Sequence, residues 1–305
     1  MIVWENAALP PTYHRLKPFM KFLFRFLLVC SALLVARQAW AYEPLNTDDA
    51  KTVGKGWNQI EAYYYNITSN GASEQSTGTS PGEEFLAAGN AKALPVTYTY
   101  GFTDQLEGMV AATYFMTPRG DYSPVSNYVF GVKWQYFGNI GEGFGLAVKP
   151  TLSLPASTQQ QVSGLGNAAT NYGLNMISSY YWRTVDVHLN LTYDRQPYNT
   201  NFLVAGDSGL QRKNVYGASI APVWNFMPKT SIALDLGVGT NTPTASPTIA
   251  NTYAMAALMY SPISTIDLGV AYLMSNDEPG QALTTGRLQK TGSNRFEIGA
   301  TFRFK

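Results

Sequence analysis

Few side chains in this chain could perform covalent or acid–base chemistry. The sequence holds one cysteine and two histidines, and His188 is the only one of the three beyond residue 30. A serine nucleophile in a strand needs a histidine base beside it, oriented by a third group. Two positions from His188, on the same strand face, stands Asn190 rather than a serine. We therefore expect His188 to pack inside the protein, and we predict neither an enzyme nor a bound cofactor.

Two adjacent carboxylates, Asp48 and Asp49, are a second candidate for chemistry. Carboxylate oxygens are ligands that calcium prefers. The surrounding "NTDDA" is equally typical of a turn or of the start of a helix. We favour the structural interpretation and predict no metal site.

The start of the chain has the layout of a secretory signal peptide. Lys21 and Arg25 precede an apolar run, and Ala39-Trp40-Ala41 is a small-x-small cleavage motif. We expect cleavage between Ala41 and Tyr42, with residues 1–41 comprising upstream sequence and the signal. An uncleaved anchor and lipidation at Cys30 are weaker alternatives, because the apolar run is short and Val29 stands where a small residue is expected. The mature part, 42–305, would begin with a periplasmic segment, 42–56.

Composition sets the mature part apart from ordinary soluble domains. Charged residues make up 13% of the chain, against about 25% in an average globular protein. Residues 42–305 hold 16 Lys and Arg and 19 Asp and Glu, a net charge of −3, with no cysteine and no basic run. These features argue against nucleic-acid binding, disulfides and thiolate metal sites. Abundant aromatic residues without a helix-length apolar run are typical of a membrane β-barrel.

Alternation of apolar and polar residues identifies the strands of such a barrel. In 127–137, Tyr128, Phe130, Val132, Trp134 and Tyr136 share one face, and 185–194 alternates as clearly. Further strands are expected at 56–67, 91–102, 105–116, 144–155, 170–182, 214–226, 231–240, 252–260, 265–275 and 294–305. The sequence thus predicts an all-β fold, a transmembrane antiparallel up-and-down β-barrel of about twelve strands.

Loop lengths support the same architecture. Long loops are expected at 68–90, 117–125, 155–169, 195–213, 241–251 and 276–293, and they alternate with tight turns. This alternation is typical of bacterial outer-membrane barrels, which have long extracellular loops and short periplasmic turns. A soluble β-sandwich is the alternative, but its last strand would leave an exposed aromatic edge.

The polar face of each strand should point into the lumen. That face carries Glu61, Glu107, Lys133, Lys149, Asp186, His188, Asp235, Asp267, Arg295, Glu297 and Arg303. These residues either line a pore or pair with one another and fill the barrel. Because a barrel of this size lies between filled and open barrels, we expect a narrow or gated pore. Cations on one arc and acids on another would favour neutral or zwitterionic solutes over strongly anionic sugars.

The C-terminal strand carries a further pattern. The pattern Glu297-x-Gly299-x-x-Phe302-x-Phe304 combines a polar residue, a glycine and two aromatic residues at alternate positions. It resembles the recognition signal that the barrel-assembly machinery reads in outer-membrane proteins. Lys305 departs from that signal, which usually ends on the aromatic residue.

Several stretches resemble the outer-membrane family of the meta-pathway of phenol degradation, whose members are called transporters. In the family's order they are "PLNTDDAKTVGKGWNQIEAYY" (44–64), "LPVTYTYGFTDQLEGMVAATY" (94–114), "KPTLSLP" (149–155), "NYGLNMISSYYW" (171–182) and "VHLNLTY" (187–193). The chain has Ser126-Asn127 where many members have Gly-Asp. The resemblance implies transport of small solutes, such as aromatic or hydrophobic compounds, across the outer membrane. Its partners would be outer-membrane lipid, the assembly machinery and a small-molecule solute; a closed structural or adhesive surface barrel is the alternative.

The alternation of loops predicts a topology. A protease-accessible tag inserted in 195–213 should be cleaved on intact cells, whereas a tag in 227–230 should be cleaved only after the outer membrane is permeabilised. Western blotting of the two tagged proteins measures this difference. Cleavage of the 227–230 tag on intact cells would contradict the strand order.

Overall fold

A computed structural model of the chain describes residues 44–70, 90–138, 143–162, 165–195, 213–240, 250–276, 279–281, 288–290 and 292–305. The predicted cleavage site, Ala41 and Tyr42, lies outside these residues, as do most of the predicted loops at 68–90, 195–213, 241–251 and 276–293. Among the described residues, no helix is long and apolar enough to cross a membrane.

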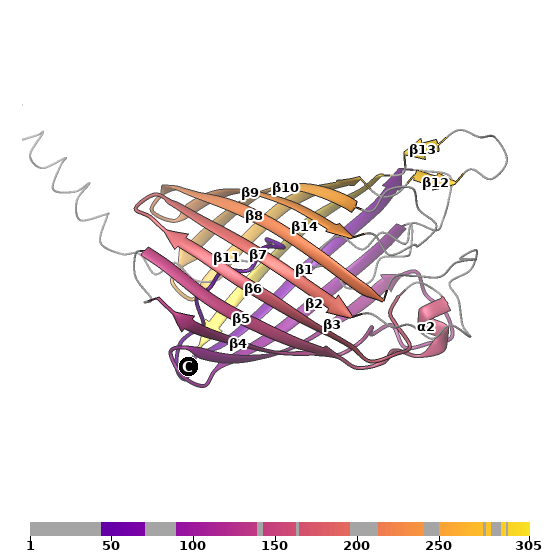
Figure 1. Cartoon of the computed structure of the whole chain (residues 1–305), viewed down its shortest axis with the longest axis horizontal. Helices are drawn as coiled ribbons and strands as arrows, with labels where there is room; N and C mark the ends of the chain where they lie inside the picture. Colours follow the sequence, from indigo (N-terminus) through magenta and orange to yellow (C-terminus); the bar gives the residue numbers. More distant parts are fainter. Residues whose placement is uncertain are drawn as a thin grey trace, which may run out of the picture. The chain divides into compact units, whose positions relative to one another are not determined.

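The described strands form a closed antiparallel barrel (Figure 1). Its twelve strands are β1 (Asn58–Asn70), β2 (Asn90–Gly101), β3 (Leu106–Thr117), β4 (Val129–Phe137), β5 (Gly143–Ser153), β6 (Asn171–Tyr181), β7 (Val185–Arg195), β8 (Asn214–Met227), β9 (Thr230–Thr240), β10 (Ala250–Ile263), β11 (Ile266–Asn276) and β14 (Gly292–Phe304). Each strand pairs with its neighbours in sequence, which confirms the predicted up-and-down barrel. Two short strands, β12 (Pro279–Gln281) and β13 (Leu288–Lys290), pair only with each other and were not predicted.

Closure is made by the first and last strands. β1 and β14 pair in unbroken register from Asn58 opposite Phe304 to Asn70 opposite Gly292. The backbone of the terminal strand is therefore hydrogen-bonded on both sides, by β1 and by β11. This pairing answers the problem of an exposed aromatic edge, because a closed barrel has no edge strand.

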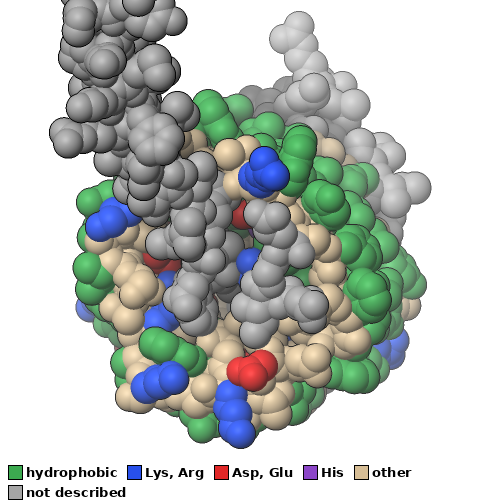
Figure 2. Space-filling model, turned by 90° about the vertical axis from the view of Figure 1, so that its left-hand side faces the viewer, with side chains coloured by type: hydrophobic (Ala, Val, Ile, Leu, Met, Phe, Trp, Pro, Cys, Tyr) green, Lys and Arg blue, Asp and Glu red, His purple; other side chains and the backbone are tan. Residues whose placement is uncertain are grey.

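Alternation places apolar side chains on the outer wall. Along β4, Trp134 is 52% exposed and Phe130 45%, whereas Lys133 is 4% and Gln135 1% exposed. The same contrast holds along β14, where Phe296 and Phe302 point outward and Arg295 and Glu297 inward. Figure 2 shows the hydrophobic side chains gathered on the outside of the barrel. An outer wall of this composition suits contact with lipid.

β10 departs from this pattern because it is apolar on both faces. Tyr253, Met255, Ala257 and Met259 point inward and are buried, while Leu258 and Tyr260 point outward. The inward side chains join buried residues of the neighbouring strands in one cluster on the wall, which comprises Ala221, Val223, Ala233, Tyr253, Met255, Ala257, Met259, Ala271 and Leu273. We call this cluster the apolar arc. The strand predicted at 252–260 is present, and none of the residues predicted to face the lumen lies on it.

A short helix, α2 (Thr158–Val162), lies in the predicted loop 155–169, at the end of the barrel opposite the C-terminus (Figure 1). A capping box begins it: the Ser157 N–H donates to Gln160 Oε1 at 2.9 Å, and the Gln160 N–H donates to Ser157 Oγ at 3.1 Å. The Gln160 side-chain amide also donates to the carbonyl oxygen of Ser123 at 2.8 Å. The loops 117–125 and 155–169 are thereby joined, and Leu165 packs beside Phe115 of β3.

The assembly signal stays a prediction, and the position of Phe304 allows it to be tested. Phe304 and Phe144 both point outward and are each 46% exposed. Phe304→Ser and Phe144→Ser therefore remove similar apolar area from the outer wall. If Phe304 is also read during assembly, Phe304→Ser should lower the yield of heat-modifiable barrel in the outer membrane several times more than Phe144→Ser. Equal yields of the two variants would assign Phe304 a packing role alone.

Candidate functional site

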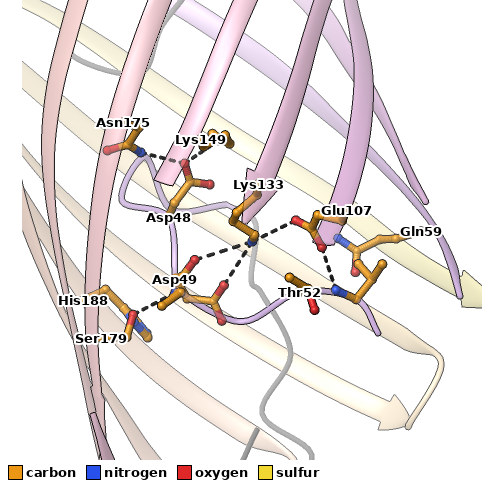
Figure 3. Close-up of polar contacts among 12 residues, drawn as sticks. Asp48, Asp49, Thr52, Gln59, Glu107, Lys133, Lys149, Asn175, Ser179 and His188 are labelled. Carbon is orange, nitrogen blue, oxygen red and sulfur yellow. Dashed lines mark hydrogen bonds and ion pairs between the residues drawn. The ribbon is translucent and has the colours of Figure 1, made fainter. Parts of the chain in front are cut away.

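The lumen contains part of the chain itself. Residues 44–53, which we call the inner segment, run through the barrel, and all but Asn46 and Asp48 are buried (Figure 3). We expected residues 42–56 to form a periplasmic segment, and the sequence pattern does not decide whether such a segment enters the lumen. Its side chains and N–H groups contact strands on several sides of the wall, as the following contacts show.

One end of the inner segment is bound to β8, β9 and β10. The Thr47 N–H donates to Asp235 Oδ2 at 2.9 Å, and the Thr47 hydroxyl donates to Asp235 Oδ1 at 2.7 Å. The Tyr253 hydroxyl also donates to Asp235 Oδ1, at 2.8 Å, and Ser219 Oγ lies 2.7 Å from Thr47 Oγ1. Leu45 packs into the apolar arc. A buried carboxylate with several donors is well solvated by the protein, so Asp235 is an anchor for the segment.

Asp48 is held by β5, β6 and β7. Its carboxylate forms an ion pair with Lys149 and accepts a hydrogen bond from Asn175 Nδ2 at 2.9 Å. Its backbone pairs with the side chain of Asn190, which accepts from the Asp48 N–H at 3.0 Å and donates to the Asp48 carbonyl oxygen at 2.7 Å. These contacts fix the residue by both its main chain and its charge.

Asp49 meets a second charge cluster on β3 and β4. Lys133 Nζ is 2.9 Å from Glu107 Oε1 and 3.6 Å from Asp49 Oδ1, and all three residues are buried. The other oxygen of Glu107 accepts from the Val53 N–H at 2.6 Å. Lys51 lies over the ring of Tyr181, 3.7 Å from its centroid. A buried ion needs this kind of pairing, because an unpaired charge in a low-dielectric interior is costly.

Ser179 also holds the inner segment, and His188 is its neighbour. Ser179 Oγ lies 2.9 Å from His188 Nδ1 and accepts the Ala50 N–H at 2.9 Å. Ser179 is opposite His188 on the neighbouring strand β6, so the search along β7 for a serine partner missed it. Both side chains are buried. With its oxygen engaged by Ala50, the serine supports the fold of the segment.

The inner segment leaves the lumen through a glycine turn. Gly54 and Gly56 have φ values of 85° and 75°, in the left-handed region that glycine adopts without strain. The Thr52 hydroxyl donates to the Asp104 carbonyl oxygen at 2.7 Å, and the Lys55 N–H donates to Asp104 Oδ1 at 3.0 Å. The turn connects the segment directly to β1.

The charged residues predicted to face the lumen all lie on the interior side of the wall. Most are buried, and Glu61 and Lys149 are half-buried. They are arranged largely in pairs: Arg303 NH1 is 2.6 Å from Asp267 Oδ2, and Arg295 pairs with Glu297. Asp186 accepts from Asn225 Nδ2 at 2.9 Å. Their role in lining a pore stays a prediction.

Sequence reasoning missed the uncharged residues that receive the inner segment. Ser179, Asn175, Asn190 and Ser219 stand in the inward phase of their strands. The feature of the sequence that could have revealed them is the presence of small polar residues at the lumen-facing positions of these strands. Gly299 is also inward, and a Cβ there would collide with Tyr63 of β1. This contact gives Gly299 a packing reason beside its predicted part in the assembly signal.

The two adjacent aspartates differ in their electrostatic surroundings. Burial acts to raise the pKa of Asp48, but the charges of Lys149 and then Lys133 outweigh it and lower the pKa below its usual value. For Asp49, burial raises the pKa, although Lys133 and Lys51 oppose that effect. The two carboxylates have different partners, and no group of three or more potential metal-binding side chains occurs among the described residues.

Comparison with known proteins relates the fold to outer-membrane channels. No family model and no curated protein matches the sequence. An outer-membrane channel from Pseudomonas putida F1 superposes with a TM-score of 0.56 at 14% identity, covering 84% of this chain and 98% of the channel. The NanC porin gives a TM-score of 0.51 at 13% identity, covering 79% of this chain and 98% of the porin. At these identities the likeness establishes a shared barrel fold.

The cluster around Lys133 predicts a non-additive response to mutation. Lys133→Met leaves Glu107 and Asp49 buried without their cation, so we expect a loss of about 3–5 kcal/mol in the free energy of unfolding. Adding Glu107→Gln removes one uncompensated charge and keeps an acceptor for the Val53 N–H, so the double variant should lose less. Urea unfolding in lipid vesicles, followed by tryptophan fluorescence, measures both. A double variant less stable than Lys133→Met would contradict the pairing.

Proposed function

We propose that the protein is an outer-membrane channel for small solutes and that the inner segment is its removable plug. The observation that carries this proposal is the position of residues 44–53 inside a closed barrel with an apolar outer wall. The porin and channel with which the barrel superposes support a channel role. The outer wall supports placement in the outer membrane, where a closed barrel satisfies all backbone groups of its strands.

The contacts of the inner segment are suited to release. Apart from the apolar contacts of Leu45 and Ala50, they are mainly hydrogen bonds and ion pairs, as at Thr47 with Asp235 and Asp48 with Lys149. Water can replace each such contact, so that a single hydrogen bond contributes only about 0.5–1.5 kcal/mol net. The segment is joined to the barrel wall through the Gly54 turn rather than through a shared sheet. Departure of the segment would leave the strand pairing intact.

The lumen behind the segment favours solutes with apolar surface. The apolar arc of β8–β11 supplies Met255, Met259 and Tyr253 on its inward side. The resemblance of the strand motifs to the phenol meta-pathway family points to small aromatic or hydrophobic compounds. We infer no catalytic role, since the inward Ser179 and His188 serve the inner segment.

A closed surface barrel is the alternative function, and the filling of the lumen by residues 44–53 favours it. In that case the inner segment would be a permanent part of the core. The joined loops 117–125 and 155–169 would then present a binding surface. The two functions differ in whether the segment leaves.

Removal of the inner segment distinguishes a channel with a removable plug from a permanently closed barrel. In planar bilayers, a variant lacking residues 44–53 should show single-channel conductance several times that of the full chain. A variant with Ala50→Cys and Ser179→Cys provides the control, because the Ala50 N–H lies 2.9 Å from Ser179 Oγ and the mature part has no other cysteine. Oxidation should close this variant and reductant should restore its conductance.

The deletion variant must first be shown to be a heat-modifiable barrel. If that barrel conducts no more than the full chain, the plug does not control a pore. Conductance of the doubly substituted variant that oxidation leaves unchanged would show that ions pass while the segment stays in place.

A further inference from the structure

The wall site that receives Asp48 is built as a carboxylate-binding site. Lys149 on β5 and Asn175 on β6 are register partners, and both give their side-chain nitrogens to the Asp48 carboxylate. Asn175 Nδ2 also lies 2.7 Å from Asn190 Oδ1, which orients the amide. A cation and an oriented amide on neighbouring strands form charge-assisted hydrogen bonds with a carboxylate.

The surroundings of Lys149 differ from those of Lys133 on the neighbouring strand β4. If the inner segment leaves, Lys133 keeps Glu107 as a partner at 2.9 Å. Lys149 forms its ion pair with Asp48 and with no other described residue. Its side chain is 18% exposed and that of Asp48 is 30% exposed, against 4% for Lys133. Release of the segment removes the ion-pair partner of Lys149 but not that of Lys133, and Asp194 of β7 is a further acid whose charge acts on Lys149. The Lys149 site is therefore the more reachable of the two and the one that loses its ion pair.

Apolar surface lies next to the carboxylate site on the wall, just as an apolar residue follows the carboxylate on the inner segment. Ala147 and Ile177 occupy the next lumen-facing positions, two residues from Lys149 and Asn175, and are register partners. Ala50 of the inner segment packs against both of them. Two residues of a strand span about 6 to 7 Å. The segment thus presents a carboxylate at Asp48 and a methyl group at Ala50, matched by the wall.

We propose that the wall site binds small carboxylates with an apolar body, and that Asp48 and Ala50 occupy it as an internal substitute for such a ligand. A ligand of this class takes the place of the Asp48 carboxylate on Lys149 and Asn175, and its apolar body covers Ala147 and Ile177. Because both cannot occupy the site, the ligand binds only after release and thereby increases the released population. This inference rests on the proposed channel with a removable plug.

Tethering sets the concentration at which a free ligand competes. A group held by a short flexible linker has an effective concentration on the order of millimolar. We therefore expect a half-maximal effect in the millimolar range. At ten times the concentration for half-saturation of the released form, the released population should rise roughly tenfold.

The experiment uses the full chain in lipid vesicles, with Thr52→Cys as a reporter in the buried inner segment. The rate at which a charged thiol reagent labels this cysteine measures release. 3-Phenylpropanoate should raise the labelling rate saturably, up to roughly tenfold. The neutral 3-phenylpropanamide and the cationic 3-phenylpropylamine should not raise it.

Variants of Lys149 and Asp48 test whether the wall site mediates the change in labelling rate. Lys149→Met should raise basal labelling, because Asp48 loses its cation, and should abolish the response to 3-phenylpropanoate. Lys149→Arg should keep the response. Asp48→Asn should raise basal labelling and keep the response, since the wall site is intact. Heat-modifiability confirms that each variant is a folded barrel.

The result that overturns this inference is distinct from failure of the channel proposal. Equal labelling with 3-phenylpropanoate and its amide, or a response that persists in Lys149→Met, would refute the carboxylate site. The conductance gained on removing residues 44–53 would still support the channel. Loss of that gain refutes the channel whatever the labelling shows.

Discussion

The unbroken hydrogen-bond ladder between β1 and β14 is the constraint on which the rest of the structure depends. It joins Asn58 to Phe304 and continues to the other end of both strands. Without it, the first and last strands would be edges that pair with other chains. With it, the sheet has one inner and one outer face, so the alternation of each strand decides which side chains meet lipid and which enclose the lumen.

Closure creates an interior that must be filled, and the chain fills it with its own residues. The acids and bases that alternation directs inward would be costly if left dry and unpaired. Lys133 is satisfied by Glu107 and Asp49, and Lys149 by Asp48. Asp235 is satisfied by Thr47 and Tyr253. The inner segment thus completes the polar network of the wall, and a channel that opens must replace these partners with water or solute.

The lumen is also asymmetric, and this asymmetry bears on what it can accommodate. On β3–β5, Glu107, Lys133 and Lys149 meet charged residues of the inner segment, whereas the inward side of β8–β11 carries the apolar arc. A solute with both a polar and an apolar side can meet both surfaces.

The sequence by itself determined the strands, their faces and their order, because these depend on a local period of two residues. Thus Trp134 and Lys133 were assigned to opposite faces correctly. The faces of β10 could not be told apart in the same way, because residues such as Met255 and Leu258 make both of them apolar. Only the tertiary structure decided what fills the lumen. Thr47 meets Asp235, 188 residues away, and Ala50 meets Ser179, 129 residues away. Such contacts have no local period, and they arise only once closure of the barrel has brought distant strands around the segment.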